Sequence, residues 1–142
     1  MGFFNKMFSG QKDRPPLDAA SPAAQRLAAM NSELEELARQ ANDNLEVVPG
    51  AQRSWVFIGK PPKRFGLAWI EDNQVKNLKS FADEKGITPA RMTRIVDEIR
   101  EAYVASESDP RFDAEVAGTR VLVAPSKRLE QKVDEIIQSA EA

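Results

Sequence analysis

The chain contains neither histidine nor cysteine among its 142 residues, and this double absence bounds the chemistry open to it. Most nucleophilic catalysis, proton relay and transition-metal binding draws on one or both of these side chains. Chemistry by carboxylates, lysine, serine or tyrosine remains open, but no spacing in the sequence assembles such residues into a recognisable site. The composition therefore favours a protein that binds over one that transforms a substrate, and it predicts no cofactor.

Asp113 and Glu115 are spaced so that their carboxylates could bind a hard cation such as magnesium. They lie two residues apart, so a strand would place both on one face. Their alternation with Phe112, Ala114 and Val116 is also typical of a strand with one solvent-facing side. We adopt this second interpretation and predict no metal site.

Basic residues flank the most aromatic part of the chain. Residues 53–59 and 64–70 are β-rich runs on either side of a Lys-Pro-Pro-Lys loop, which predicts a hairpin. Positive charge beside stacking rings is typical of sequence-tolerant nucleic-acid surfaces, so the candidates for anion binding are Arg53, Lys60, Lys63 and Arg64. The alternative, which we favour for the rings themselves, is that the aromatic face with Trp55 and Trp69 belongs to the core.

Residues 73–103 show the pattern of two helices joined by a turn. Gly86 ends the first apolar face, and Thr88 followed by Pro89 starts the second helix. The stretch L-K-S-F-A-D-E-K-G-I-T-P-A-R-M-T-R-I-V resembles a helix-turn-helix, and this resemblance implies DNA contacts by Arg91, Thr93 and Arg94. An ordinary helical hairpin fills the same apolar positions, and the second helix also carries carboxylates that would repel phosphates, at Asp97, Glu98 and Glu101.

The first eight residues, M-G-F-F-N-K-M-F, combine three phenylalanines with two methionines. A helix would place four of these side chains on one side, and we take them as contact residues for a partner or a membrane: Phe3, Phe4, Met7 and Phe8. The segment lacks the apolar length and cleavage site of a secretory signal, and Lys6 stands where the myristoylation pattern requires Ser or Thr. Two interpretations stay open: a short amphipathic segment that lies on a membrane or partner, or a terminus whose aromatic side chains fold back onto the domain.

Residues 9–20 are polar, contain two adjacent prolines and show no periodic apolar face, which predicts a linker. We therefore expect a flexible N-terminal segment over residues 1–20 and a single domain over residues 21–142. A helix should begin at Ser21-Pro22 and end near Asn42, and a second hairpin should span residues 111–124 before a last helix. The predicted fold is α+β, an antiparallel sheet of about four strands built from two β-hairpins with helices mainly on one face, in the order α-ββ-αα-ββ-α.

Composition limits the partners and the location. Charged residues at 30% and a net charge of −2 are typical of an ordinary globular chain. They argue against strong non-specific electrostatic binding to polyanions. No apolar run approaches the roughly 20 residues needed to span a bilayer, and the lack of cysteine suits a reducing cytoplasm.

We therefore expect a non-enzymatic interaction or accessory protein with a protein partner. The expected location is cytoplasmic. The sequence also allows peripheral attachment to the inner face of a membrane through the N-terminus. The alternative is a DNA-binding protein that uses residues 73–103. An enzyme working through carboxylate, Lys or Tyr chemistry comes third, and the sequence leaves the partner's identity and the oligomeric state open.

Overall fold

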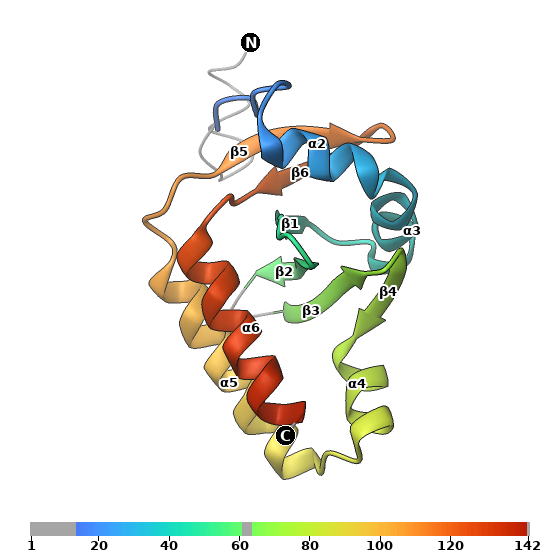
Figure 1. Ribbon diagram of the computed structural model, residues 1–142, viewed down its shortest axis with the longest axis vertical. Coiled ribbons are helices and arrows are strands. Elements are labelled where there is room, and N and C mark those ends of the chain that lie inside the picture. Colours follow the sequence, from blue (N-terminus) through green and yellow to red (C-terminus); the bar gives the residue numbers. More distant parts are fainter. Residues whose placement is uncertain (1–13, 61–63, 142) are drawn as a thin grey trace.

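The computed structural model describes residues 14–60 and 64–141 and builds them around one six-stranded sheet (Figure 1). The strands follow the order β4-β3-β2-β1-β6-β5 across the sheet, and all neighbours are antiparallel except β1 and β6, which are parallel. Their bounds are β1 Leu45–Val48, β2 Arg53–Lys60, β3 Arg64–Glu71, β4 Gln74–Asn77, β5 Phe112–Val116 and β6 Thr119–Val123.

Helices cover both faces of this sheet (Figure 1). The helices α2 (Pro22–Ala29) and α3 (Asn31–Ala41) pack against one face, and α4 (Leu78–Lys85), α5 (Pro89–Ala105) and α6 (Lys127–Glu141) pack against the other. Because successive strand residues point to opposite faces, Val47 of β1 joins the first core and Val48 joins the second. The sheet is thus the middle layer of three.

The α+β class is confirmed, and both predicted hairpins are present as β2–β3 and β5–β6. The prediction of four antiparallel strands covered mainly on one face was wrong in detail, since the sheet is mixed, has six strands and carries helices on both faces. Strand β4 lies where we expected the start of a helix. Asp72 and Asn73 both have positive φ, at 53° and 61°, and form the two-residue turn that returns the chain from β3 into β4.

The single helix predicted from Ser21 to about Asn42 is divided at Met30, which has φ −111° and ψ 23°. Its start is as expected, because the Ser21 hydroxyl accepts a hydrogen bond from the backbone N–H of Ala24. The apolar stripe survives the break, since Leu27, Met30 and Leu34 are all buried in one core. The helix pair ends at Asn42 in the left-handed conformation.

The chain is already tied to the sheet before Ser21. The backbone N–H of Leu17 donates to the carbonyl oxygen of Asp113 at 2.7 Å, and the N–H of Asp113 donates to that of Pro15 at 2.8 Å. The side chain of Leu17 packs against the α2–α3 core. The described fold therefore includes residues 14–20 together with the predicted domain. Within the described ranges, no helix has the length and apolarity to cross a membrane.

Candidate functional site

Glu46 places a carboxylate in the interior of the fold, with only 7% of the residue exposed. The Tyr103 hydroxyl on α5 donates to its Oε1 at 2.8 Å, and the Arg111 Nε donates to its Oε2 at 2.7 Å. Burial, and then the charge of Glu46, raise the pKa of Tyr103 above its usual value, so the phenol stays protonated and remains a donor. This cluster of a carboxylate, a phenol and a guanidinium joins β1, α5 and the start of β5.

Arg111 completes the cluster by binding the loop between α5 and β5. Its Nη1 donates to the carbonyl oxygens of Ser106 and Asp109, and its Nη2 donates to the Ser106 hydroxyl. No buried side-chain nitrogen or oxygen of the described residues lacks a hydrogen-bond partner. Since each of its buried polar groups has a partner, the cluster holds β1, α5 and the loop before β5 together.

A second polar cluster forms beside the first, at the start of α6. The Ser126 hydroxyl donates to Asp109 Oδ2 at 2.6 Å, and Arg128 Nη2 donates to Oδ1 at 2.9 Å. The Ser126 hydrogen bond, aided by Arg128, lowers the pKa of Asp109. Ser126 also accepts from the N–H of Leu129, so this contact caps α6. Here too the geometry explains structure rather than catalysis.

Among the candidates for anion binding, Arg53 lies apart from Lys60 and Arg64. Arg53 begins β2 and Lys60 ends it, so about 23 Å of strand separates them at about 3.3 Å per residue. Arg53 instead forms ion pairs with Asp134 and Glu141, at 3.5 and 3.7 Å, and lies over the Trp55 ring. Lys60 is the cross-strand partner of Arg64 at the other end of the hairpin, and Lys63 lies outside the described residues.

The aromatic residues of this hairpin are core residues, as we favoured. Trp55 and Trp69 are direct cross-strand partners with ring centroids 5.3 Å apart, and both are buried. Phe57 is also fully buried, and Phe65 is half-buried. The large rings are therefore already packed and offer little surface for stacking bases.

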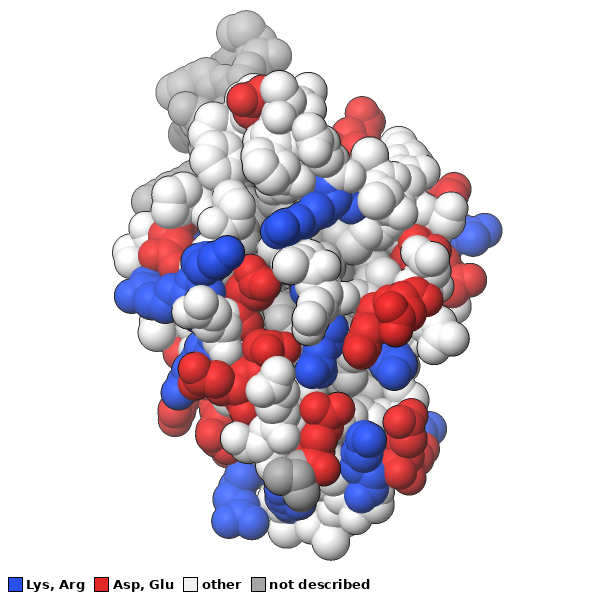
Figure 2. Space-filling view, viewed as in Figure 1, with Lys and Arg blue, Asp and Glu red and all other residues white. Residues whose placement is uncertain are grey.

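The candidates for DNA contact occupy the first two turns of α5. Thr93 and Arg94 are exposed, whereas Arg91 is half-buried and donates to the carbonyl oxygen of Ser139 on α6. The helical spacing puts Arg94 on the same exposed face as three carboxylates, Asp97, Glu98 and Glu101. Figure 2 shows basic and acidic side chains interspersed over the visible face, without a broad area of positive charge. Nothing in this arrangement favours binding to phosphates.

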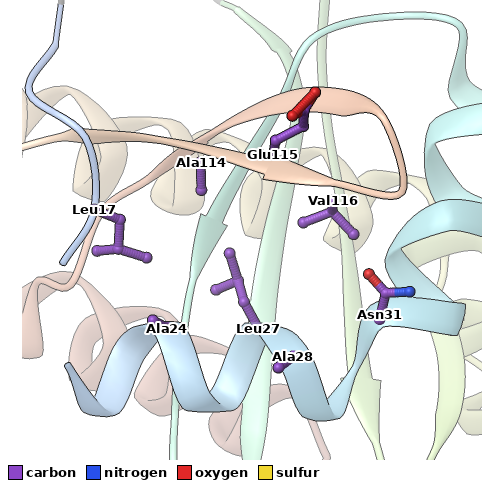
Figure 3. Close-up of a pocket in the computed structure, with 8 residues that line it drawn as sticks. All are labelled: Leu17, Ala24, Leu27, Ala28, Asn31, Ala114, Glu115 and Val116. Carbon is purple, nitrogen blue, oxygen red and sulfur yellow. The ribbon is translucent and has the colours of Figure 1, made fainter. Parts of the chain in front are cut away.

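A groove runs between α2 and the edge strand β5 (Figure 3). We call it the α2–β5 groove; it has a volume of about 300 Å³ and is lined by Leu17, Ala24, Leu27, Ala28, Asn31, Ala114, Glu115 and Val116. The side chains of Leu27, Ala114 and Val116 point into the space between helix and strand, and that of Glu115 points away (Figure 3). Sequence reasoning missed this groove, although the small side chains of Ala24 and Ala28, one turn apart, are the feature that opens it.

A larger hollow, of about 470 Å³, lies between α5 and α6. Half of its lining residues are charged, with mixed sign, namely Glu98, Glu101, Arg128, Lys132 and Glu135, and the others include Ala102, Ala105 and Leu129. The described residues contain no group of three or more acidic side chains arranged to hold a metal ion. Asp113, one of the two carboxylates considered for magnesium, instead forms an ion pair with Arg120 at 2.6 Å.

The four N-terminal candidates, Phe3, Phe4, Met7 and Phe8, lie outside the described residues. Comparisons with protein-family models, with curated proteins and with solved structures gave no significant match.

Proposed function

We propose that this protein is a non-enzymatic interaction protein that captures a protein partner through its Phe-rich N-terminal segment, residues 3–8. The observation that carries the proposal is the attachment of Pro15 and Leu17 to Asp113 of β5. This pairing ties the chain to the edge of the sheet a few residues after the Phe-rich segment in the sequence. Three phenylalanines held close to a folded domain form an apolar surface that usually has a place to dock.

Two further observations support binding over catalysis. The buried titratable groups, Glu46, Tyr103 and Arg111, are hydrogen-bonded to one another and to the backbone. The described surface also carries no cluster of ligands for a metal. A binding role needs neither a free titratable group nor a metal ion, because it can use the terminal apolar segment.

A protein partner suits the segment better than a lipid bilayer. One or two turns of helix bury little apolar area, and Lys6 is the only basic residue in the first eight, so attachment to a membrane would be weak and reversible. We propose a cytoplasmic location, with attachment at the inner face of a membrane as a secondary contact. A groove on a partner protein would cover more of each phenylalanine ring than a lipid surface.

A capture experiment with the intact chain tests the proposal. The immobilised wild-type protein is compared with a triple variant that carries Phe3→Ser, Phe4→Ser and Phe8→Ser. Asn5→Ser is the matched control, because a helix would place Asn5 on the opposite side of the segment. We expect the triple variant to lose a partner that the wild type and the control both retain. Equal capture by all three proteins would contradict the proposal, and binding only to anionic lipid vesicles would replace the protein partner with a membrane.

A further inference from the structure

We propose that the edge of β5 at Glu115 binds an extended segment of a partner protein, which adds to the sheet as a short strand beside the α2–β5 groove. This site lies on the described part of the chain and goes beyond the proposed capture through residues 3–8. The observations that carry it are the hydrogen bonds that this edge already makes to extended backbone and the exposed side chain of Glu115.

The edge of β5 already holds extended backbone at one position. β5 is the last strand of the sheet, and among the six strands its one neighbour is β6. On the open side, Pro15 and Leu17 both hydrogen-bond to Asp113, in a bridge that runs parallel to β5. The chain then turns after Asp18 into α2, where the N–H of Ser21 donates to the Asp18 carbonyl oxygen. The bridge therefore ends before it reaches the next outward-facing residue of β5.

That next residue is Glu115, and its main chain faces the groove. Outward-facing residues alternate along an antiparallel pair, so Glu115 directs its N–H and C=O away from β6, as Asp113 does. Glu115 lines the groove although its side chain points away from it (Figure 3), so its main-chain atoms form that part of the lining. Within residues 14–60 and 64–141, no hydrogen bond occupies these two main-chain groups.

The neighbouring bridge determines the direction of the added segment. Pro16 pairs with Asp113. Leu17 therefore lies at the level of Ala114, and both residues line the groove. A parallel segment would have to place its acceptor for the Glu115 N–H at this occupied level. In antiparallel pairing, a single residue opposite Glu115 exchanges both hydrogen bonds with it, so we expect an antiparallel segment.

The side chains around this position specify which segment fits. The residue before the paired one lies opposite Val116 and points towards α2, where Ala24 and Ala28 leave room for an aliphatic side chain. The paired residue shares the face of the Glu115 carboxylate, and opposite charges stabilise such cross-strand pairs. The fitting segment therefore has an aliphatic residue followed by Lys or Arg.

The groove has the polarity and the length of a site for a short peptide. Polar and apolar atoms contribute about equally to its surface, which suits a segment that offers both backbone groups and an aliphatic side chain. The helical wall from Ala24 to Asn31 is about 10 Å long at 1.5 Å per residue, the length of about three extended residues. Binding by so few residues is weak alone, and it gains from a second contact by the same partner.

A second copy of this chain fits the edge poorly. Two β5 strands paired about a two-fold axis at Glu115 would place their Glu115 carboxylates directly opposite each other, and like charges in that position are destabilising. Residues 15–17 of each copy also cover its own Asp113. The occupant is therefore a segment of a different protein.

NMR titration of the full-length protein with a defined peptide tests the proposal. The probe is the capped pentapeptide Thr-Val-Lys-Gly-Ser, in which valine precedes the lysine and glycine lets the peptide turn away from Leu17. We expect the probe to shift the Glu115 amide resonance and to slow the hydrogen exchange of this amide. The Val75 amide on the opposite edge strand, β4, is the internal control and should not respond. No response at Glu115, or equal responses at both amides, would overturn the proposal.

Charge reversal tests the chemistry of the segment. The matched probe Thr-Val-Glu-Gly-Ser should bind the wild type about fivefold more weakly than the lysine probe. Glu115→Lys should reverse this preference, and it should preserve the fold because the side chain is exposed and points away from the groove. Equal binding of the two probes to the wild type, or an unchanged preference in the variant, would overturn the proposal.

Two further measurements need no change at Glu115. A lysine probe in which an ester replaces the amide between valine and lysine loses the donor to the Glu115 carbonyl, and it should bind about fivefold more weakly. A Glu115 amide that already exchanges slowly in the free protein would overturn the proposal, since the chain itself would then cover the edge.

The triple phenylalanine variant separates this inference from the proposed function. It should bind the lysine probe as the wild type does, so loss of capture through residues 3–8 leaves the β5 site intact. Loss of probe binding in this variant would overturn the β5 site as an independent one, whether or not the capture of a partner is observed.

Discussion

At the scale of single residues, Glu46 is the point at which three elements meet, since it accepts hydrogen bonds from Tyr103 and Arg111. Glu46→Gln should lower the free energy of unfolding by about 3 kcal/mol, because it leaves the Arg111 guanidinium buried without its counter-charge. Urea denaturation measures this change. Glu35→Gln on the exposed side of α3 is the control and should change stability by less than about 0.5 kcal/mol. A loss of stability no larger than the control's would mean that the ion pair is not needed for the fold.

The same residue should control the ionisation of Tyr103, which is the only tyrosine of the chain. Its raised pKa in the folded state means that the neutral phenol is favoured, so this stabilisation is present below about pH 10 and is lost as the pH rises further. Ultraviolet absorption of tyrosinate should therefore appear only together with alkaline unfolding. In Glu46→Gln the pKa should fall, because a neighbouring negative charge is removed. Ionisation near pH 10 in the folded wild type, with its near-ultraviolet circular dichroism intact, would contradict this expectation.

Local alternation made the tryptophan pair predictable, whereas the Glu46 cluster could not be found in the sequence. Trp55 and Trp69 lie on strands joined by one short loop, so their pairing follows from the hairpin. Glu46 lies 57 residues from Tyr103 and 65 from Arg111. A lone carboxylate in L-E-V-V has the pattern of a solvent-facing position, and only the tertiary arrangement gives it partners.

At the scale of elements, the turn between α4 and α5 depends on Gly86, which has φ 65°. Gly86→Ala should destabilise the protein by about 1 kcal/mol, because an L side chain is strained in the left-handed region although nothing lies within 4 Å of the added Cβ. Chemical denaturation tests this, with Gly66→Ala as a control whose Cβ would make only ordinary contacts, the nearest at 3.8 Å. Equal effects of the two substitutions would show that backbone strain is not the cause.

The elements that escaped prediction are short or interrupted. β4 has four residues and one apolar side chain, Val75, which fits a helix face as well as a strand. The break at Met30 leaves the apolar stripe unchanged, so periodicity cannot reveal it. The capping residues Ser21 and Thr88 were predictable, since each needs only its immediate neighbours.

At the scale of the whole molecule, one sheet shared by two helical layers should unfold as a unit. Leu34→Ala on α3 and Ile137→Ala on α6 create cavities on opposite faces, and each should cost about 2–5 kcal/mol. Tryptophan fluorescence reports on the α4–α6 side, and far-ultraviolet circular dichroism reports on all helices. Both signals should shift together for both variants. If Leu34→Ala moves the dichroism transition but not the fluorescence transition, the two layers unfold separately.

The number of layers was the main feature of the whole fold that the sequence did not predict. The apolar stripe of α2 and α3 could pack on either face of a sheet. The hairpins alone do not specify which of their strands become neighbours in the sheet. The pairing of β1 with β6 brings together residues from opposite halves of the chain, such as Glu46 and Leu122. No local pattern specifies such a contact.

This parallel pair also determines when a newly synthesised chain can complete its fold. Strands β1 to β4 are consecutive antiparallel neighbours joined by short turns, so they can assemble while the rest of the chain is still being made. β1 has its second neighbour only after β6 has left the ribosome. Until then β1 is an open edge in what becomes the middle of the sheet, and an open edge is the surface on which strands of other chains mispair.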